Sequence, residues 1–215
     1  MIYLSITKVL INLTLQNLAF MDEMFIYGHL GFKHIIDWAG WDHILFVMAL
    51  TLRYIWSDWK KLLVLITAFT IGHSITLALS TLHWVNFPIS WVETLIPITI
   101  LITAFANLWV KSFHFNEKYP IIYFFALFFG LIHGLGFSNY LKSLLGKEQS
   151  ILGPLFSFNL GLEIGQLWMV SVLLIISFIF VSLMKVQRRL YLQIGSVIAI
   201  GLALNMVFER IHSNF

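Results

Sequence analysis

Histidine and carboxylate residues recur in this chain inside or beside long apolar runs, where ionisable side chains are not expected. Six of them are candidate metal ligands: His34, Asp42, His43, His73, His133 and Glu163. Neutral imidazoles and carboxylates bind zinc, nickel, cobalt, copper or iron without any thiolate. The chain contains no cysteine, so a bound ion must be held by such groups. We therefore predict a site for a divalent transition metal such as nickel, cobalt or zinc.

Three further residues are predicted to orient the ligands or to admit the ion: Asp37, Glu93 and Asn159. Asp42 and His43 are adjacent, so their side chains diverge by about 100° on a regular helix. Either the helix begins irregularly and both bind the ion, or the carboxylate orients the imidazole. Asp37 is predicted either to orient an imidazole in the same way or to cap the helix that follows.

Each candidate also has an ordinary structural interpretation. Asp42 is a potential N-cap, and Glu93 a solvated helix end. His73 and His133 are potential hydrogen-bonding residues between helices. Glu163 would have to be protonated or paired, because a charged side chain inside an apolar span costs roughly 2.5 to 3.5 kcal/mol. The convergence of so many costly residues favours a metal site.

The elements that position these residues are predicted to be transmembrane helices. Of the 215 residues, 60% are hydrophobic and 11% charged, against about 25% charged in soluble domains. Runs of about 20 apolar residues cross a bilayer as helices. The fold class is therefore an all-α polytopic transmembrane bundle of about six spans. They cover residues 42–57, 61–83, 90–111, 120–141, 152–184 and 190–209.

The first 33 residues are predicted to form an N-terminal extension, and residues 34–215 the six-span transmembrane domain. Residues 1–20 lack the small-residue cleavage site of a signal peptide, so we expect an interfacial or poorly ordered segment. Residues 21–33 carry Asp22, Glu23 and Lys33, which favours a position on the membrane surface over a crossing.

The basic residues predict the orientation of the bundle. Loops after spans one, three and five hold eight of the thirteen: Arg53, Lys60, Lys61, Lys111, Lys118, Lys185, Arg188 and Arg189. The opposite side holds Lys8, Lys33, Lys142, Lys147 and Arg210. The positive-inside rule then places both termini outside the cytoplasm, in a bacterial inner membrane. The net charge of +3 is thus explained by topology and not by binding of nucleic acid.

Depth along the spans supports one site. Counting about 1.5 Å per residue from the predicted ends, the candidate ligands fall at similar depth in the outer half of the membrane. Six glycines lie beside them and would let helix backbones approach closely: Gly72, Gly130, Gly134, Gly136, Gly161 and Gly165. The inner halves of the spans are almost free of ionisable groups.

Four segments carry a resemblance to a known family. They are HIIDWAGWDHILF at 34–46, FTIGHSITL at 69–77, HGLGF at 133–137 and NLGLEIGQ at 159–166. Together they resemble the HupE/UreJ family of membrane proteins, which are associated with hydrogenase and urease maturation and regarded as nickel or cobalt permeases. The resemblance extends over residues 21–210.

The resemblance implies metal handling by His34, Asp42 and His43, which match the family's histidine and aspartate-histidine pair in span one. Here seven residues separate His34 from the pair, where better-studied members have five. The span-four motif keeps His133, but Phe137 replaces a second histidine and Asn139 stands near the position of a glutamate. The chain is therefore identified as a member of a sister branch with variant motifs.

Transport is the function that the sequence favours: a permease that captures the ion on the outer side and passes it inward. The alternative is an intramembrane zinc-dependent hydrolase, with Asp42 or Glu163 as general base and a zinc-activated water as nucleophile. The expected partners are the lipid bilayer, the metal ion, further copies of the chain and metalloenzyme maturation proteins.

Overall fold

The computed structural model describes residues 2–37, 40–110, 113, 121–145 and 151–214. Its helices are α1 (Ile2–Ile36), α2 (Trp41–Thr51), the 3-10 turn η2 (Trp56–Asp58), α3 (Trp59–Thr81), α4 (Ile89–Leu108), α5 (Ile121–Leu145), α6 (Leu152–Ser177), the π-helical η3 (Phe178–Leu183) and α7 (Arg188–Asn214). The described residues contain no strand. The all-α prediction is confirmed.

Five helical segments are long and apolar enough to cross a membrane. They are Trp56–Thr81, Ile89–Leu108, Ile121–Leu144, Leu152–Leu183 and Arg188–Ser213, close to the five spans predicted after the first. The protein is therefore an integral membrane protein. Among the predicted topology signals, Lys111, Lys118, Lys147 and the side chain of Lys8 lie outside the described residues.

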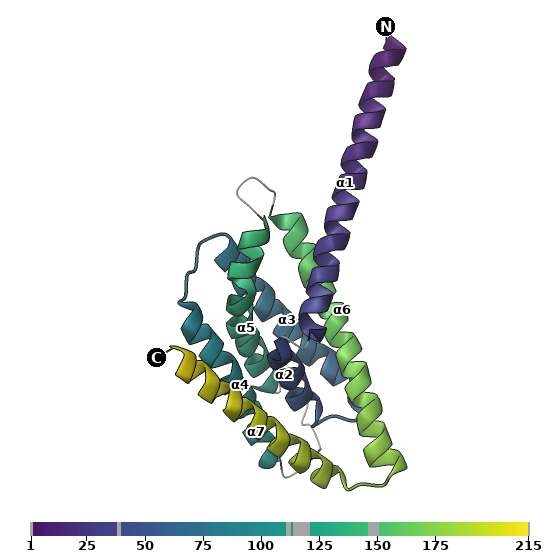
Figure 1. Ribbon diagram of the computed structural model, residues 1–215. Coiled ribbons are helices and arrows are strands. Elements are labelled where there is room, and N and C mark those ends of the chain that lie inside the picture. Colours follow the sequence, from purple (N-terminus) through teal and green to yellow (C-terminus); the bar gives the residue numbers. More distant parts are fainter. Residues whose placement is uncertain (1, 38–39, 111–112, 114–120, 146–150, 215) are drawn as a thin grey trace.

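The segment predicted as the first span, residues 42–57, does not form one long helix in the structure. α2 has only 11 residues, about 16 Å of helix, which is roughly half of a hydrocarbon core about 30 Å thick. The second half of α1 precedes α2 in the bundle and packs along α6 from Met24, whose carbonyl accepts a hydrogen bond from Ser157, to Phe32 beside Gly165. Figure 1 shows α1 entering the bundle and ending beside α2.

α1 runs without a break across Lys33, where the sequence predicts a boundary between extension and bundle. The N-terminal half of α1 projects beyond the other helices, as Figure 1 shows, and its described side chains up to Met21 are exposed. Lys33 is also exposed, whereas Tyr27 and Ile35 are buried. The charges of this segment thus lie on one face of a helix whose other face is packed.

Glycines bring α3 and α5 into backbone contact. A Cβ on Gly72 would collide with the carbonyl of Leu127, and one on Gly130 with the carbonyl of Phe69. One turn further, a Cβ on Gly134 would collide with the carbonyl of His73. The sequence-based prediction of close approach at these glycines is confirmed, and the contact holds α3 and α5 against each other beside two of the candidate histidines.

A second pair, α1 and α6, approaches in the same way. A Cβ on Gly31 would meet the carbonyl of Phe158, and one on Gly161 would meet the carbonyl of Gly28. Small residues are the usual means of close helix contact in membranes, where the hydrophobic effect does not drive helices together. This contact fixes the depth at which α1 ends inside the bundle.

One end of the bundle gathers basic residues, and we call it the basic end. Arg188, at the start of α7, donates to the carbonyl of Arg53 at 2.9 Å and pairs with Asp58 at 3.3 Å. The segment after α2 and the start of α7 are therefore neighbours, as expected for two loops on the same side of a membrane.

Candidate metal centre

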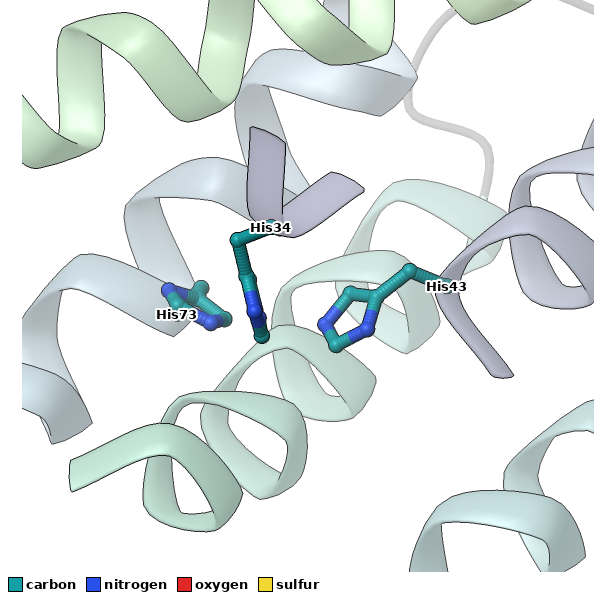
Figure 2. Close-up of side chains that lie close together, drawn as sticks. All are labelled: His34, His43 and His73. Atoms are coloured by element: carbon teal, nitrogen blue, oxygen red, sulfur yellow. The ribbon is translucent and has the colours of Figure 1, made fainter. Parts of the chain in front are cut away.

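Three histidines from three helices converge inside the bundle, and we call them the imidazole centre: His34 of α1, His43 of α2 and His73 of α3. Each offers one ring nitrogen such that the three nitrogens lie within 4.8 Å of one another. In Figure 2 the three rings point toward a common space. His43 is 4% exposed and His73 is fully buried, so a ligand held there would be screened from lipid and water.

The break between α1 and α2 positions two of these rings. The amide of Asp37 still donates to the carbonyl of Lys33, which ends α1, and the amide of Gly40 donates to the carbonyl of Asp37 at 3.1 Å. His34 thus lies in the last turn of α1 and His43 in the first turn of α2. Broken membrane helices commonly place ion sites at such interruptions, near the middle of the bilayer.

Asp42 orients one of the imidazoles. Its Oδ1 lies 2.9 Å from Nδ1 of His43 and accepts the backbone amide of the same residue at 2.8 Å. An ionised carboxylate can accept hydrogen bonds but cannot donate them. The Nδ1 atom of His43 therefore carries the proton, and its Nε2 atom keeps a lone pair. This is the carboxylate-to-histidine arrangement that tunes metal ligands. Gly40 is the N-cap of α2, so Asp42 does not have the capping role considered above.

The ring nitrogens of the centre are largely without hydrogen-bond partners in the described part of the chain. The buried ring nitrogens without a partner are His34 Nε2, His43 Nε2 and both nitrogens of His73, together with Nδ1 of the neighbouring His133. A buried polar group left unpaired costs about 1 to 3 kcal/mol. A bound metal ion would occupy such lone pairs, so the donor set fits a transition metal. The role of His73 as a hydrogen-bonding residue between helices finds no support here.

His133 lies beside the centre and not within it. Its ring centroid is 5.2 Å from that of His43, and its Nε2 lies 3.1 Å from the hydroxyl of Thr99 on α4. This contact links α5 to α4, as the structural interpretation of His133 expects. The Nδ1 atom of His133 is buried and has no hydrogen-bond partner among the described residues.

The other predicted site residues lie apart from the imidazole centre. Glu163 of α6 accepts a hydrogen bond from Thr67 of α3 at 3.2 Å. Glu93 pairs with Arg210 at 3.4 Å on an exposed surface. Asn159 donates to the carbonyl of Leu155 in its own helix at 2.8 Å. Of the nine residues singled out from the sequence, the structure brings His34, His43 and His73 together, with Asp42 and His133 next to them.

Aromatic rings close the centre on the side of the basic end. Phe46 and Phe69 lie with ring centroids 4.9 Å apart, and their centroids are 4.9 Å and 5.2 Å from that of His133. Phe129 adds a third ring, 6.0 Å from Phe46. We call these three the inner aromatic layer. Each occurs three or four residues from a histidine of its own helix, on the side of the basic end.

A second aromatic layer closes the opposite side. Phe137 of α5 lies 4.0 Å from the ring of His34 and stacks on Phe158 of α6 at 4.8 Å. Phe137 is the residue for which the resemblance implies a histidine in the family, and here it covers an imidazole. The imidazole centre is thus enclosed between two layers of phenylalanine.

The sequence reasoning did not identify these layers, nor Thr99 as a partner of His133. The eight Trp and twenty Phe of the chain suggest lipid-facing surface as readily as core, so composition does not single out five rings. For four of the five rings, a spacing of three or four residues between Phe and His on the same helix is the signal that was available, and Phe158 of α6 has no such neighbour.

Comparison with known protein families matches residues 11–210 to the family described as HupE / UreJ protein. No curated protein and no solved structure matches the chain. The match extends over most of the chain and agrees with the motifs around the imidazole centre. The chain therefore belongs to the HupE/UreJ family.

Proposed function

We propose that this protein is a permease for a divalent transition-metal ion of the nickel or cobalt class. The observation that carries the proposal is the convergence of His34, His43 and His73, three imidazoles from three helices, with lone pairs that no described residue uses. Imidazole nitrogens suit nickel, cobalt and zinc much better than they suit calcium or magnesium.

The position of the centre supports transport. It lies where a membrane crossing is interrupted between α1 and α2, a common place for the ion sites of transporters. The inner aromatic layer and the second layer of Phe137 and Phe158 separate it from both ends of the bundle, as an alternating-access carrier requires in its occluded state. In this proposal the ion passes when Phe137 with Phe158, and then Phe46 with Phe69, change their packing.

Each polar residue has a defined task in this scheme. Asp42 holds the His43 ring so that Nε2 faces the ion, and the three imidazoles replace part of its water shell. His133, with Nδ1 unpartnered and its ring next to His43, receives the ion on its way toward the basic end.

Family membership supports a nickel or cobalt role, and the proposal includes localisation and partners. The protein would lie in a bacterial inner membrane with the basic end cytoplasmic and both termini outside, as the positive-inside rule favours. There it would supply metal to maturation proteins of a metalloenzyme, alone or as a homo-oligomer.

The test is uptake of nickel or cobalt into proteoliposomes that contain the full-length protein. Wild type is compared with His73→Ala and with His212→Ala, which removes an exposed histidine at the end of α7. We expect uptake by wild type and by His212→Ala, and none above empty liposomes by His73→Ala. Equal uptake by all three proteins would contradict a route through the centre.

One observation favours a second candidate function, an intramembrane zinc-dependent hydrolase. Three imidazoles, one of them oriented by the carboxylate of Asp42, leave a fourth coordination position open, as in catalytic zinc sites. Such a protein would bind one zinc ion tightly and cleave an ester or amide in detergent. Zinc-dependent cleavage lost in His73→Ala, without metal uptake by wild type, would replace the permease by this candidate.

A further inference from the structure

A groove that contains several polar side chains lies between α3 and α6, outside the imidazole centre. Its volume is about 540 Å³, and it runs from Ala78 and Leu152 at one end to Thr67 and Glu163 at the other. Most of its lining is apolar, as expected beside lipid. Five of its side chains carry oxygen atoms: Thr67, Thr70, Ser74, Asn159 and Glu163. We call the cavity that these five side chains line the oxygen groove.

The hydroxyl groups that line this groove already donate their hydrogens to acceptors within the protein. Thr67 donates to Glu163 at 3.2 Å, Thr70 to Gln166 at 2.7 Å, and Ser74 to the carbonyl of Thr70 at 2.7 Å. What these residues offer to an occupant is therefore oxygen lone pairs. A site of this kind attracts a cation.

The amide of Asn159 leaves another oxygen without a partner. Its nitrogen donates to the carbonyl of Leu155, and this fixes the orientation because two carbonyl oxygens would repel each other in the flipped amide. The Oδ1 atom is buried and accepts no hydrogen bond from the described residues. A buried acceptor of this kind is costly unless a ligand uses it.

Glu163 contributes the charge. It lies eleven residues after Leu152, about 16 Å along α6, and forms no ion pair with any described residue. Inside an apolar span a single carboxylate charge is stabilised by one bound positive charge. A monovalent cation balances it, whereas a divalent ion would leave an excess charge in the membrane.

An exposed pair on α7 provides the contrast. Asn205 and Glu209 have the same spacing as Asn159 and Glu163, but there the amide nitrogen of Asn205 donates directly to the carboxylate at 2.8 Å. The two side chains of the α7 pair therefore form a hydrogen bond with each other. In the groove, the amide of Asn159 donates elsewhere, and both side chains keep acceptor oxygens for a ligand.

We propose that Thr67, Asn159 and Glu163 form a binding site for one sodium ion, separate from the imidazole centre. Oxygen ligands suit hard cations, whereas nickel, cobalt and zinc prefer the imidazoles. The proposal concerns sodium binding alone and does not rest on the proposed function.

The experiment follows thermal unfolding of the full-length protein in detergent while sodium chloride replaces choline chloride at constant ionic strength. Binding of radioactive sodium is measured in parallel. We expect a saturable rise in Tm and about one sodium ion per chain. Glu163→Gln is expected to lose both signals, and Glu209→Gln, the matched control on α7, to keep them.

Thr67→Val tests the site without touching the carboxylate, in case Glu163→Gln does not fold. Loss of one oxygen ligand is expected to weaken sodium binding about tenfold. His73→Ala should keep the sodium response, which separates this proposal from the proposed function.

Three results would overturn the sodium site. The first is a sodium response that is unchanged in Glu163→Gln and in Thr67→Val. The second is an unfolding temperature that sodium and choline affect equally. The third is a dependence on pH without any dependence on sodium, which would show that the carboxylate holds a proton.

Discussion

The imidazole centre and the oxygen groove lie on two faces of the same helix, α3, and differ in burial and in the kind of donor atom. His73 is fully buried against α5, where Gly72 and Gly134 bring the backbones into contact. On the groove side of α3, Ile71 is 48% exposed between Thr70 and Ser74. Close backbone contact excludes lipid from one face, and the wider separation of α3 and α6 admits an occupant on the other.

In the two proposals, one membrane helix presents two kinds of donor to two kinds of ion. Unpartnered nitrogens lie in the enclosed centre, and oxygens whose hydroxyl hydrogens are already used lie in the open groove. If the comparison is right, substitutions in one region leave the ion binding of the other unchanged.

The largest effect is expected for His73→Ala, which removes a direct ligand of the centre. Metal affinity should fall by more than about 100-fold, the upper range for loss of a residue that merely orients a ligand. Isothermal titration with nickel and cobalt measures it, with His212→Ala as the control. An affinity within a few-fold of wild type would remove His73 from the site.

Asp42→Asn is expected to weaken metal binding by about 10- to 100-fold, because the neutral amide no longer makes the His43 ring more basic. The same titration applies, and Glu209→Gln controls for loss of a carboxylate elsewhere. A larger loss than in His73→Ala would indicate that Asp42 itself binds the ion.

Gly134→Ala is expected to lower the free energy of unfolding by about 1 to 3 kcal/mol, because its Cβ would push α5 away from the carbonyl of His73. Metal affinity should fall with it, since His73 moves relative to His43. Unfolding in detergent measures the stability. Gly201→Ala is the matched control, because a Cβ there meets nothing within 4 Å and alanine favours helix. Equal stability of the two variants would argue against the close contact.

The smallest effect on metal binding is expected for Glu163→Gln, although the sequence predicts Glu163 as a ligand. The structure places it with Thr67, outside the three-histidine group, and independent sites usually influence each other by about twofold at most. Nickel titration of this variant beside wild type provides the measurement. A tenfold loss would return Glu163 to the metal site and merge the two regions.

Much of the fold was predictable, because a bilayer imposes a simple rule on sequence. Apolar runs of sufficient length predicted the last five crossings, and α3 to α7 lie close to those ranges. The first predicted span, 42–57, differs from the structure, in which α2 covers only Trp41–Thr51 and α1 continues past Lys33 into the bundle. A hydropathy pattern does not show that one face of α1 packs on α6 through Gly31 and Gly161.

The sequence by itself determined which residue types are available: imidazoles without cysteine, carboxylates inside apolar spans, and glycines at the helix contacts. Only the tertiary structure decided which of them meet, by ending α1 inside the bundle and turning one face of α3 toward α5 and another toward α6. The physical reason is that helix contacts in a membrane depend on the shape of facing surfaces. Those contacts bring His34, His43 and His73 together and leave Glu163 to a separate groove.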